Sequence, residues 1–239
     1  MSAKSSIKRR IAFTCGSKGG DGKSWLIIHA LQWLRAIGVD VVVIDTDDET
    51  STLSRFIPEA KFIPIRYPTA IDGIIQTAVE CPKDVVVLVD LPARAGTEFG
   101  EWFELIPWNE LEDQGVKFTA LAVVAGTKDS IEGAIRWKAF LKDGNAAFVV
   151  AVNERDDVGT YLASKTRQSF QAAKVPDLFI PKMDPRISAA LDARSWTLAH
   201  ALETEQADYL TQLMSRARLR RYRDLIYSQF ETVRTYLLP

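Results

Sequence analysis

The stretch TCGSKGGDGKSW, residues Thr14 to Trp25, decides how the rest of the chain is interpreted. It follows an apolar run, RIAFTC at Arg10–Cys15, that we expect to be a strand. It precedes apolar residues at helical spacing over Ser24–Ile37. Glycines between a strand and a helix let backbone N–H groups converge on phosphate oxygens, and a helix N-terminus favours an anion. The stretch therefore predicts a phosphate-binding loop.

The side chains at the end of this loop suit the same chemistry. Lys23 would supply positive charge to the β- and γ-phosphates, and the Ser24 hydroxyl could ligate Mg²⁺. The usual spacing, G-x-x-x-x-G-K-[ST], fits only with a shift, because five residues separate Gly16 from Gly22. The alternative is a plain glycine-rich turn before a helix. The coincidence of the lysine–serine pair with a strand and a helix disfavours that alternative.

Composition excludes several other classes of protein. The 239 residues suit one α/β domain or at most two small ones, and the net charge of −1 means that any nucleic-acid or membrane contact must come from a local patch. Cys15 and Cys81 have no C-x-x-C spacing, which argues against a disulfide scaffold, a zinc site or an iron–sulfur cluster. His29 and His200 are isolated, as packing or surface histidines usually are.

The chain carries no obvious address for export or membrane insertion. No apolar run reaches the ~18 residues of a membrane span, and the first ten residues lack an apolar signal core. We therefore expect a cytoplasmic location.

Apolar runs without alternation recur along the chain and predict buried parallel strands, separated by helices. They lie at 39–45, 85–90, 118–125, 146–153 and 178–180. This pattern predicts one α/β domain, 1–239, with a mostly parallel, doubly wound sheet. Asp45, Asp90 and Asn153 stand at strand ends, where ligands bind in such sheets. We expect residues 93–114 to be an insertion or a mobile cover, and one long C-terminal helix over about 203–238.

The run Lys18-Gly-Gly-Asp-Gly-Lys-Ser24 resembles the deviant Walker A motif, K-G-G-x-G-K-[ST], of ParA/MinD-type ATPases. The resemblance implies a P-loop fold with ATP and Mg²⁺ as cofactors. It implies that Lys18 reaches across an ATP-closed homodimer to the partner's phosphates. It also places the nucleotide against Gly19, Gly20, Asp21, Gly22, Lys23 and Ser24.

Two further segments extend the resemblance to the acidic residues. VVVIDTDDET resembles the family's strand-two motif, I-D-x-D-x-Q, which implies that Asp47 positions the attacking water. Asp48 stands where proline is usual and Glu49 where glutamine is usual, and the added charge could slow turnover or tune metal binding. VVVLVDLPARAG resembles Walker B and its switch, with D-x-P-P reduced to one proline. The proposed metal ligands are Ser24, Asp45 and Asp90.

The later segments of the chain resemble the family near the nucleotide base. Asn153 matches an asparagine that contacts adenine. IPKMDPRISAALDAR resembles the late I-P-x-D-x-x-[IV]-x-x-A segment, which places Pro181 at the base.

The stretch SRARLRRYRD concentrates five arginines in the C-terminal helix: Arg216, Arg218, Arg220, Arg221 and Arg223. Three interpretations stay open. The arginines form a solvated face of a packed helix, or they contact the DNA backbone without sequence preference. Alternatively, they belong to an amphipathic membrane anchor that uses the apolar tail at 233–238.

The resemblance implies an ATPase that dimerises on ATP and binds DNA nonspecifically, on the nucleoid, to partition or position a cargo. The cargo would be a plasmid, a chromosome or another assembly, in plasmid stability or conjugative transfer, and an adaptor protein would stimulate hydrolysis. A membrane-cycling positioning ATPase of the MinD kind is one alternative. A small-molecule, ATP-dependent synthetase on the same fold is another.

Overall fold

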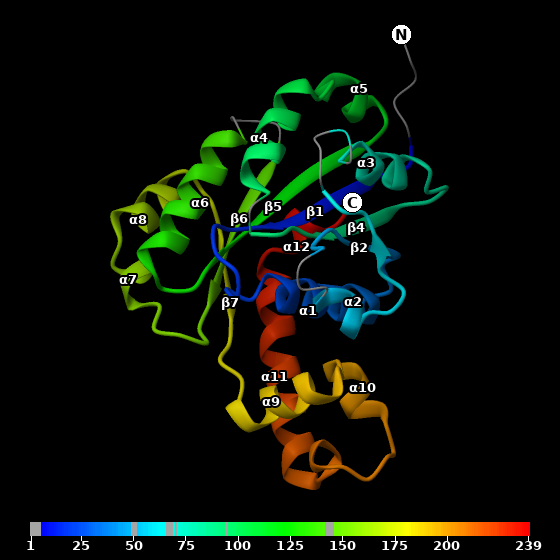
Figure 1. Ribbon diagram of the computed structural model, residues 1–239, viewed down its shortest axis with the longest axis vertical. Coiled ribbons are helices and arrows are strands. Elements are labelled where there is room, and N and C mark those ends of the chain that lie inside the picture. Colours follow the sequence, from blue (N-terminus) through cyan, green and yellow to red (C-terminus); the bar gives the residue numbers. More distant parts are fainter. Residues whose placement is uncertain (1–5, 49–51, 66–68, 70, 94, 142–145) are drawn as a thin grey trace.

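A seven-stranded, all-parallel sheet is the centre of the computed structural model, which describes residues 6–48, 52–65, 69, 71–93, 95–141 and 146–239 (Figure 1). Its order is β3-β2-β4-β1-β5-β6-β7. The strands are β1 (Arg9–Cys15), β2 (Val41–Asp45), β3 (Lys61–Phe62), β4 (Val85–Asp90), β5 (Val116–Val124), β6 (Ala147–Asn153) and β7 (Asp177–Ile180). The predicted α/β class and the doubly wound parallel sheet are confirmed. Glu49 lies outside the described residues.

Helices cover both faces of this sheet, and each face has its own apolar core. Along β1, Ile11 and Phe13 belong to one core while Ala12, between them, belongs to the other, as the two-residue period of a strand requires. The first face is covered by α3 (Asp72–Val79), α4 (Gly96–Leu105), α5 (Trp108–Asp113), α6 (Lys128–Phe140), α7 (Gly159–Leu162) and α8 (Lys165–Ala172).

The second face carries the helix that follows the glycine-rich loop. Helix α1 packs there with nearly its whole circumference buried, because the sheet, α2 and α11 all contact it. The covering elements are α1 (Lys23–Ala36), α2 (Thr52–Phe56), α9 (Pro185–Arg194), α10 (Leu198–Glu203), the 3₁₀ turn η2 (Tyr209–Thr211), α11 (Leu213–Thr232) and α12 (Arg234–Leu237). Figure 1 shows α11 beside α1 and α9.

The segment 93–114 is not a mobile cover, contrary to our expectation. It forms α4 and α5, and Phe99, Trp102 and Phe103 are buried in the first core. The ring of Phe13 in β1 lies 5.6 Å from that of Phe99, and Phe103 stacks on Trp108 at 5.4 Å between ring centroids. Its many aromatic residues therefore serve packing against the sheet.

The predicted C-terminal helix over 203–238 is also corrected. Helix α10 ends at Glu203, and a capping box between Asp208 and Thr211 begins the 3₁₀ turn. Gln212 is extended, with φ −62° and ψ 148°, so α11 begins only at Leu213. Leu213 and Met214, in the first turn of α11, are 80% and 63% exposed.

Most apolar residues of α11 and α12 pack on the sheet. Leu219, Tyr222, Ile226, Phe230, Val233 and Leu237 are buried in the second core, whereas Leu225 is 47% exposed. The tail at 233–238 is therefore part of the packed domain. Across the part of the chain that the structure describes, no helix has the length and apolar character needed to span a membrane.

Two buried arginines fix the beginning of the central strand. The Arg9 guanidinium donates to main-chain carbonyls around the end of α3 and to that of Gln114. Arg10 donates from Nε to the carbonyl of Leu238 at 2.9 Å and from Nη1 to Thr119 Oγ1 at 3.3 Å. Both charges are satisfied by several acceptors, as burial of a guanidinium requires. They tie β1, and with it the loop that follows, to the end of α3, to Gln114 and to the main chain at Leu238.

Candidate nucleotide-binding site

The glycine-rich loop runs from the end of β1 into α1, where the sequence placed it. Gly20 has φ +82° and Gly22 has φ +99°, a backbone conformation that residues with a side chain rarely adopt. Gly22 is the N-cap of α1, and no side chain caps that helix end. The first N–H groups of α1 are therefore available to an anion.

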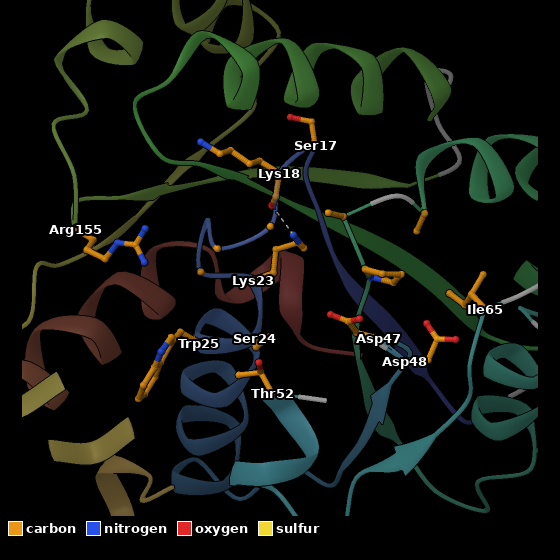
Figure 2. Close-up of a pocket in the computed structure, with 16 residues that line it drawn as sticks. Ser17, Lys18, Lys23, Ser24, Trp25, Asp47, Asp48, Thr52, Ile65 and Arg155 are labelled. Carbon is orange, nitrogen blue, oxygen red and sulfur yellow. Dashed lines mark hydrogen bonds between the residues drawn. The ribbon is translucent and has the colours of Figure 1, made fainter. Parts of the chain in front are cut away.

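A cavity of about 750 Å³ opens over this loop. Lys18, Gly19, Gly20, Gly22, Lys23 and Ser24 line it from one side, and Asp47, Asp48, Thr52, Ile65 and Pro92 also contribute (Figure 2). Six of the predicted nucleotide and catalytic residues thus meet at one cavity, and Asp47 faces them. The volume and the mixture of lysines and free backbone donors suit a polyphosphate.

The two lysines of the loop point in different directions. Lys23 Nζ donates to the main-chain oxygen of Lys18 at 2.9 Å, the contact drawn as a dashed line in Figure 2. The Lys18 side chain extends away from Lys23 in the same view. Lys23 is 8% exposed, so its ammonium is held at the floor of the cavity. Lys18 lines the same cavity, but its side chain does not extend toward the Lys23 ammonium.

The carboxyl ends of β2 and β4 bring two aspartates together. Asp45 pairs with Asp90 in the parallel register, and both residues are buried. Thr14 Oγ1 donates to Asp90 Oδ1 at 2.9 Å, and Ser24 also donates to this carboxylate. Burial raises the pKa of Asp90 to about 6, and these two hydrogen bonds oppose the rise. Ser24 and Asp90, both named as metal ligands in the sequence analysis, therefore contact each other.

Asp45 and Asp47 differ in what they face. Both oxygens of Asp45 are occupied: Oδ1 accepts from the amide of Asp47 at 3.1 Å. Oδ2 accepts from the amide and hydroxyl of Ser54 at 3.0 and 2.6 Å. Asp45 therefore anchors α2 from behind the cavity, whereas Asp47 and Asp48 line the cavity itself.

A second cavity of about 580 Å³ shares Gly22, Trp25 and Arg155 with the first. Asn153 and Pro181, both predicted to lie at the base, line it together with His29, Met183 and Tyr222. Its walls combine aromatic, apolar and amide groups with the charged residues Arg155, Lys182 and Asp192. Such a lining suits a flat heterocyclic base better than a phosphate.

Asn153 also has a direct structural role. Its Nδ2 donates to the main-chain oxygen of Asp21 at 2.8 Å, and its Oδ1 accepts from the amide of Arg155 at 3.1 Å. A Cβ added to Gly22 would come within 2.5 Å of Asn153 Nδ2, so the close approach requires glycine there. The asparagine at the end of β6 braces the loop that follows β1.

The five arginines of α11 are not equivalent. Arg216 donates to the carbonyl of Thr204, Arg223 pairs with Asp224 at 2.8 Å, and Arg218 lies 3.5 Å from Asp184. Arg220 and Arg221 are exposed. The helix therefore does not present all five charges on one free face, as the spacing had allowed.

Several residues of the two cavities had no predicted site role, among them Trp25, His29, Arg155 and Tyr222. Arg155 follows Asn153 by two residues and lines both cavities, so its proximity to a strand-end asparagine was a usable signal. Tyr222 carries no such signal, because it comes from α11, far along the chain. Its Oη lies 3.3 Å from Nε2 of His29 in α1.

The strand, loop and helix, with Ser24 hydrogen-bonded to Asp90, form a fold similar to that of solved MinD structures. A similar solved structure is the septum site-determining protein MinD of Pyrococcus horikoshii, complexed with Mg-ADP. It has a TM-score of 0.54 and 15% identity over 91% of this chain and 96% of that chain. The MinD cell division protein of Aquifex aeolicus has a TM-score of 0.52 and 16% identity, with the same coverage. No protein-family model matches the sequence, and no curated protein matches it. At these identities the likeness shows the fold alone.

Proposed function

We propose that this protein is a Mg²⁺-dependent ATPase that closes into a homodimer over ATP and binds DNA without sequence preference. Its work would be to partition or position a plasmid, a chromosome or another cargo. One observation carries the proposal. Lys23 is fixed at the cavity floor, while the side chain of Lys18 extends away from it (Figure 2).

Nucleotide binding is supported by the chemistry of the two adjoining cavities. The phosphates would meet Lys23 and the free N–H groups of the loop, including those of Gly19, Gly20 and Gly22. The base would enter the second cavity beside Pro181. Asn153 would reach it there while continuing to brace the loop.

The residues present also fit a magnesium ion. Ser24 and Asp90 offer a hydroxyl and a carboxylate that already contact one another, and Mg²⁺ is commonly bound by few protein oxygens together with substrate phosphates. When bound, the ion would neutralise charge on the phosphates. Both Asp45 oxygens already accept hydrogen bonds, so this residue would act from behind that pair. Asp47 lines the cavity and is the proposed group that orients the attacking water.

The direction of Lys18 supports dimerisation. A lysine that extends away from Lys23 would be able to deliver its charge to a second protomer that approaches the cavity. In a closed pair, that charge would reach the partner's transferring phosphoryl group, where positive charge is needed. Each site would then be complete only when both protomers hold nucleotide.

The surface for DNA would be the outer side of α11. Arg220 and Arg221 are exposed there, and Arg218 is half exposed. A dimer would present two such helices, which doubles the number of phosphate contacts. The apolar tail is buried, so a membrane anchor at 233–238 would first have to leave the core. This observation favours DNA over the membrane alternative.

Sedimentation velocity with a non-hydrolysable ATP analogue tests the dimer. We expect wild type to dimerise, Lys23→Ala to lose nucleotide binding, and Lys18→Ala to bind nucleotide but stay monomeric. A Lys18→Ala dimer of normal strength would contradict the role across the interface.

The same preparation can then be tested for binding to nonspecific duplex DNA and to anionic liposomes side by side, which distinguishes DNA from membrane as the surface that the protein binds. We expect ATP-dependent DNA binding that weakens steeply with salt. A triple Arg218, Arg220, Arg221→Gln variant should bind DNA weakly, whereas Arg223→Gln, already paired with Asp224, should resemble wild type. ATP-dependent binding to liposomes alone would contradict the DNA proposal.

A further inference from the structure

The glycine-rich loop contains a carboxylate, Asp21, that neither the proposed chemistry nor the fold requires. It is 5% exposed, and its Oδ2 has no hydrogen-bond partner within the part of the chain that the structure describes. Asp21 does not belong to the lining of the cavity over the loop. Only its main-chain oxygen, bound by Asn153, has a structural task. A buried carboxylate oxygen without a donor is costly, so its presence calls for a reason.

Four charged groups face this carboxylate, and three of them are cations. Lys18 and Lys23 belong to the loop and α1, while Arg155 and Asp156 belong to the segment after β6. Burial raises the pKa of Asp21. Lys23 opposes the rise most, followed by Lys18 and Arg155, whereas Asp156 adds to it. The lysine that most stabilises the Asp21 charge is therefore the one proposed to hold the phosphates.

A polyphosphate and the Asp21 carboxylate would compete for the positive charge of the same side chain, Lys23. When phosphates arrive, Lys23 turns its charge to them, and the carboxylate loses its largest compensation. It also comes under the repulsion of like charges, which water screens poorly at a buried site. The repulsion grows with each phosphate charge, and it disappears if the carboxyl group takes up a proton.

Resting on the proposed function, we propose that Asp21 opposes polyphosphate binding and takes up a proton when the phosphates bind. The loop then holds ATP more weakly than it would without this carboxylate, and releases nucleotide more readily. The effect depends on the charge of the ligand, which a residue that merely supports the loop would not produce.

Isothermal titration calorimetry of wild type and Asp21→Asn with ATP, ADP and adenosine tests this inference. We expect Asp21→Asn to bind ATP tighter by on the order of tenfold, ADP by a smaller factor, and adenosine as wild type does. Asp156→Asn is the matched control, because it removes a neighbouring carboxylate that is half exposed and paired with Arg155. It should change ATP affinity little.

Proton uptake is measured on wild type alone and needs no variant. Titrations with ATP in two buffers of different ionisation enthalpy should show protons taken up by wild type, and fewer by Asp21→Asn. ATP affinity of wild type should also rise as pH falls toward the mildly acidic range.

Each result has a separate consequence. Unchanged or weaker ATP binding by a folded Asp21→Asn variant, or equal gains for ATP and adenosine, would overturn the inference while leaving the ATPase proposal intact. Absence of proton uptake by wild type would overturn the proton-linked part. If wild type and Asp21→Asn both fail to bind ATP, the proposed function itself is wrong.

Discussion

The buried histidine in α1 makes the folded protein sensitive to acid in a way that can be isolated. His29 is 2% exposed, between the rings of Trp25 and Tyr222 at 5.4 and 5.5 Å. Its Nδ1 has no hydrogen-bond partner among the described residues, and Nε2 meets only the Tyr222 hydroxyl. Burial lowers the pKa of His29 from 6.5 to about 4. We therefore expect His29 to destabilise the folded state when the pH falls from 7 to 4.5.

The sign and size of the effect follow from proton linkage. The unfolded chain takes up the His29 proton near pH 6.5 but the folded chain only near pH 4, so stability is lost as pH falls through that window. The full difference is worth about 3 kcal/mol, of which about 2 kcal/mol is lost by pH 4.5. Asp90 acts in the opposite direction. Its pKa is raised from 3.8 to about 6, so its contribution to stability grows as pH falls over that range. The wild-type pH profile alone therefore conceals both effects.

Urea unfolding of wild type and His29→Gln at pH 7 and 4.5, followed by far-UV circular dichroism, separates them. Asp90 contributes equally to both proteins, so it cancels in the comparison at each pH. We expect the variant to gain about 2 kcal/mol relative to wild type between pH 7 and 4.5, whatever its stability at pH 7. His200→Gln, at an exposed position, should follow the wild-type profile. Parallel profiles for His29→Gln and wild type would refute the reasoning.

Two further substitutions test the packing around the site. In Gly133→Ala, the new Cβ would lie 2.7 Å from Ser17 Oγ and 3.0 Å from its amide, so α6 would push on the loop. We expect nucleotide affinity to fall on the order of tenfold in a fluorescent-analogue titration, since a small displacement of binding groups is costly. If Gly133→Ala binds nucleotide as tightly as wild type does, the loop accommodates the added methyl group and the reasoning is wrong. Trp33 is buried, stacks on Phe230 at 5.4 Å and donates to Glu231 at 3.0 Å. Trp33→Ala should cost about 3–5 kcal/mol in urea unfolding, and a loss below about 1 kcal/mol would contradict this contact's role.

Most of the sheet could be predicted from sequence because most of its strands contain a buried, continuous apolar run. The exception is β3, Lys61–Phe62, which has two residues, both exposed, and so leaves no apolar run. The start of α11 was misplaced because Leu210, Leu213 and Met214 have helical spacing. The capping box at Asp208 and Thr211 lies within that row and interrupts it.

The candidate site was predictable where its residues lie next to each other in the chain. Lys18 to Ser24 form one segment, and Asp45 and Asp90 end neighbouring strands, so their meeting needed only the fold. The sequence does not reveal which hydrogen-bond partner each of these side chains has. The occupation of Asp45 by Ser54 and of Arg216 by Thr204 depends on distances set by tertiary packing.

The polar groups of the loop already interact within the protein before any nucleotide arrives, although Asp21 Oδ2 accepts no hydrogen bond among the described residues. Lys23 donates to the Lys18 carbonyl, Ser24 donates to Asp90, and Asp21 draws on the charge of both lysines. Such contacts are expected, because a buried charge or hydroxyl without a partner costs free energy. A polyphosphate must replace them, so its affinity is the difference between the charge-assisted bonds gained and the internal bonds lost. Two lysines in a loop therefore do not by themselves imply tight binding. For the same reason, removal of Lys23 and removal of Asp21 should act in opposite directions on one site.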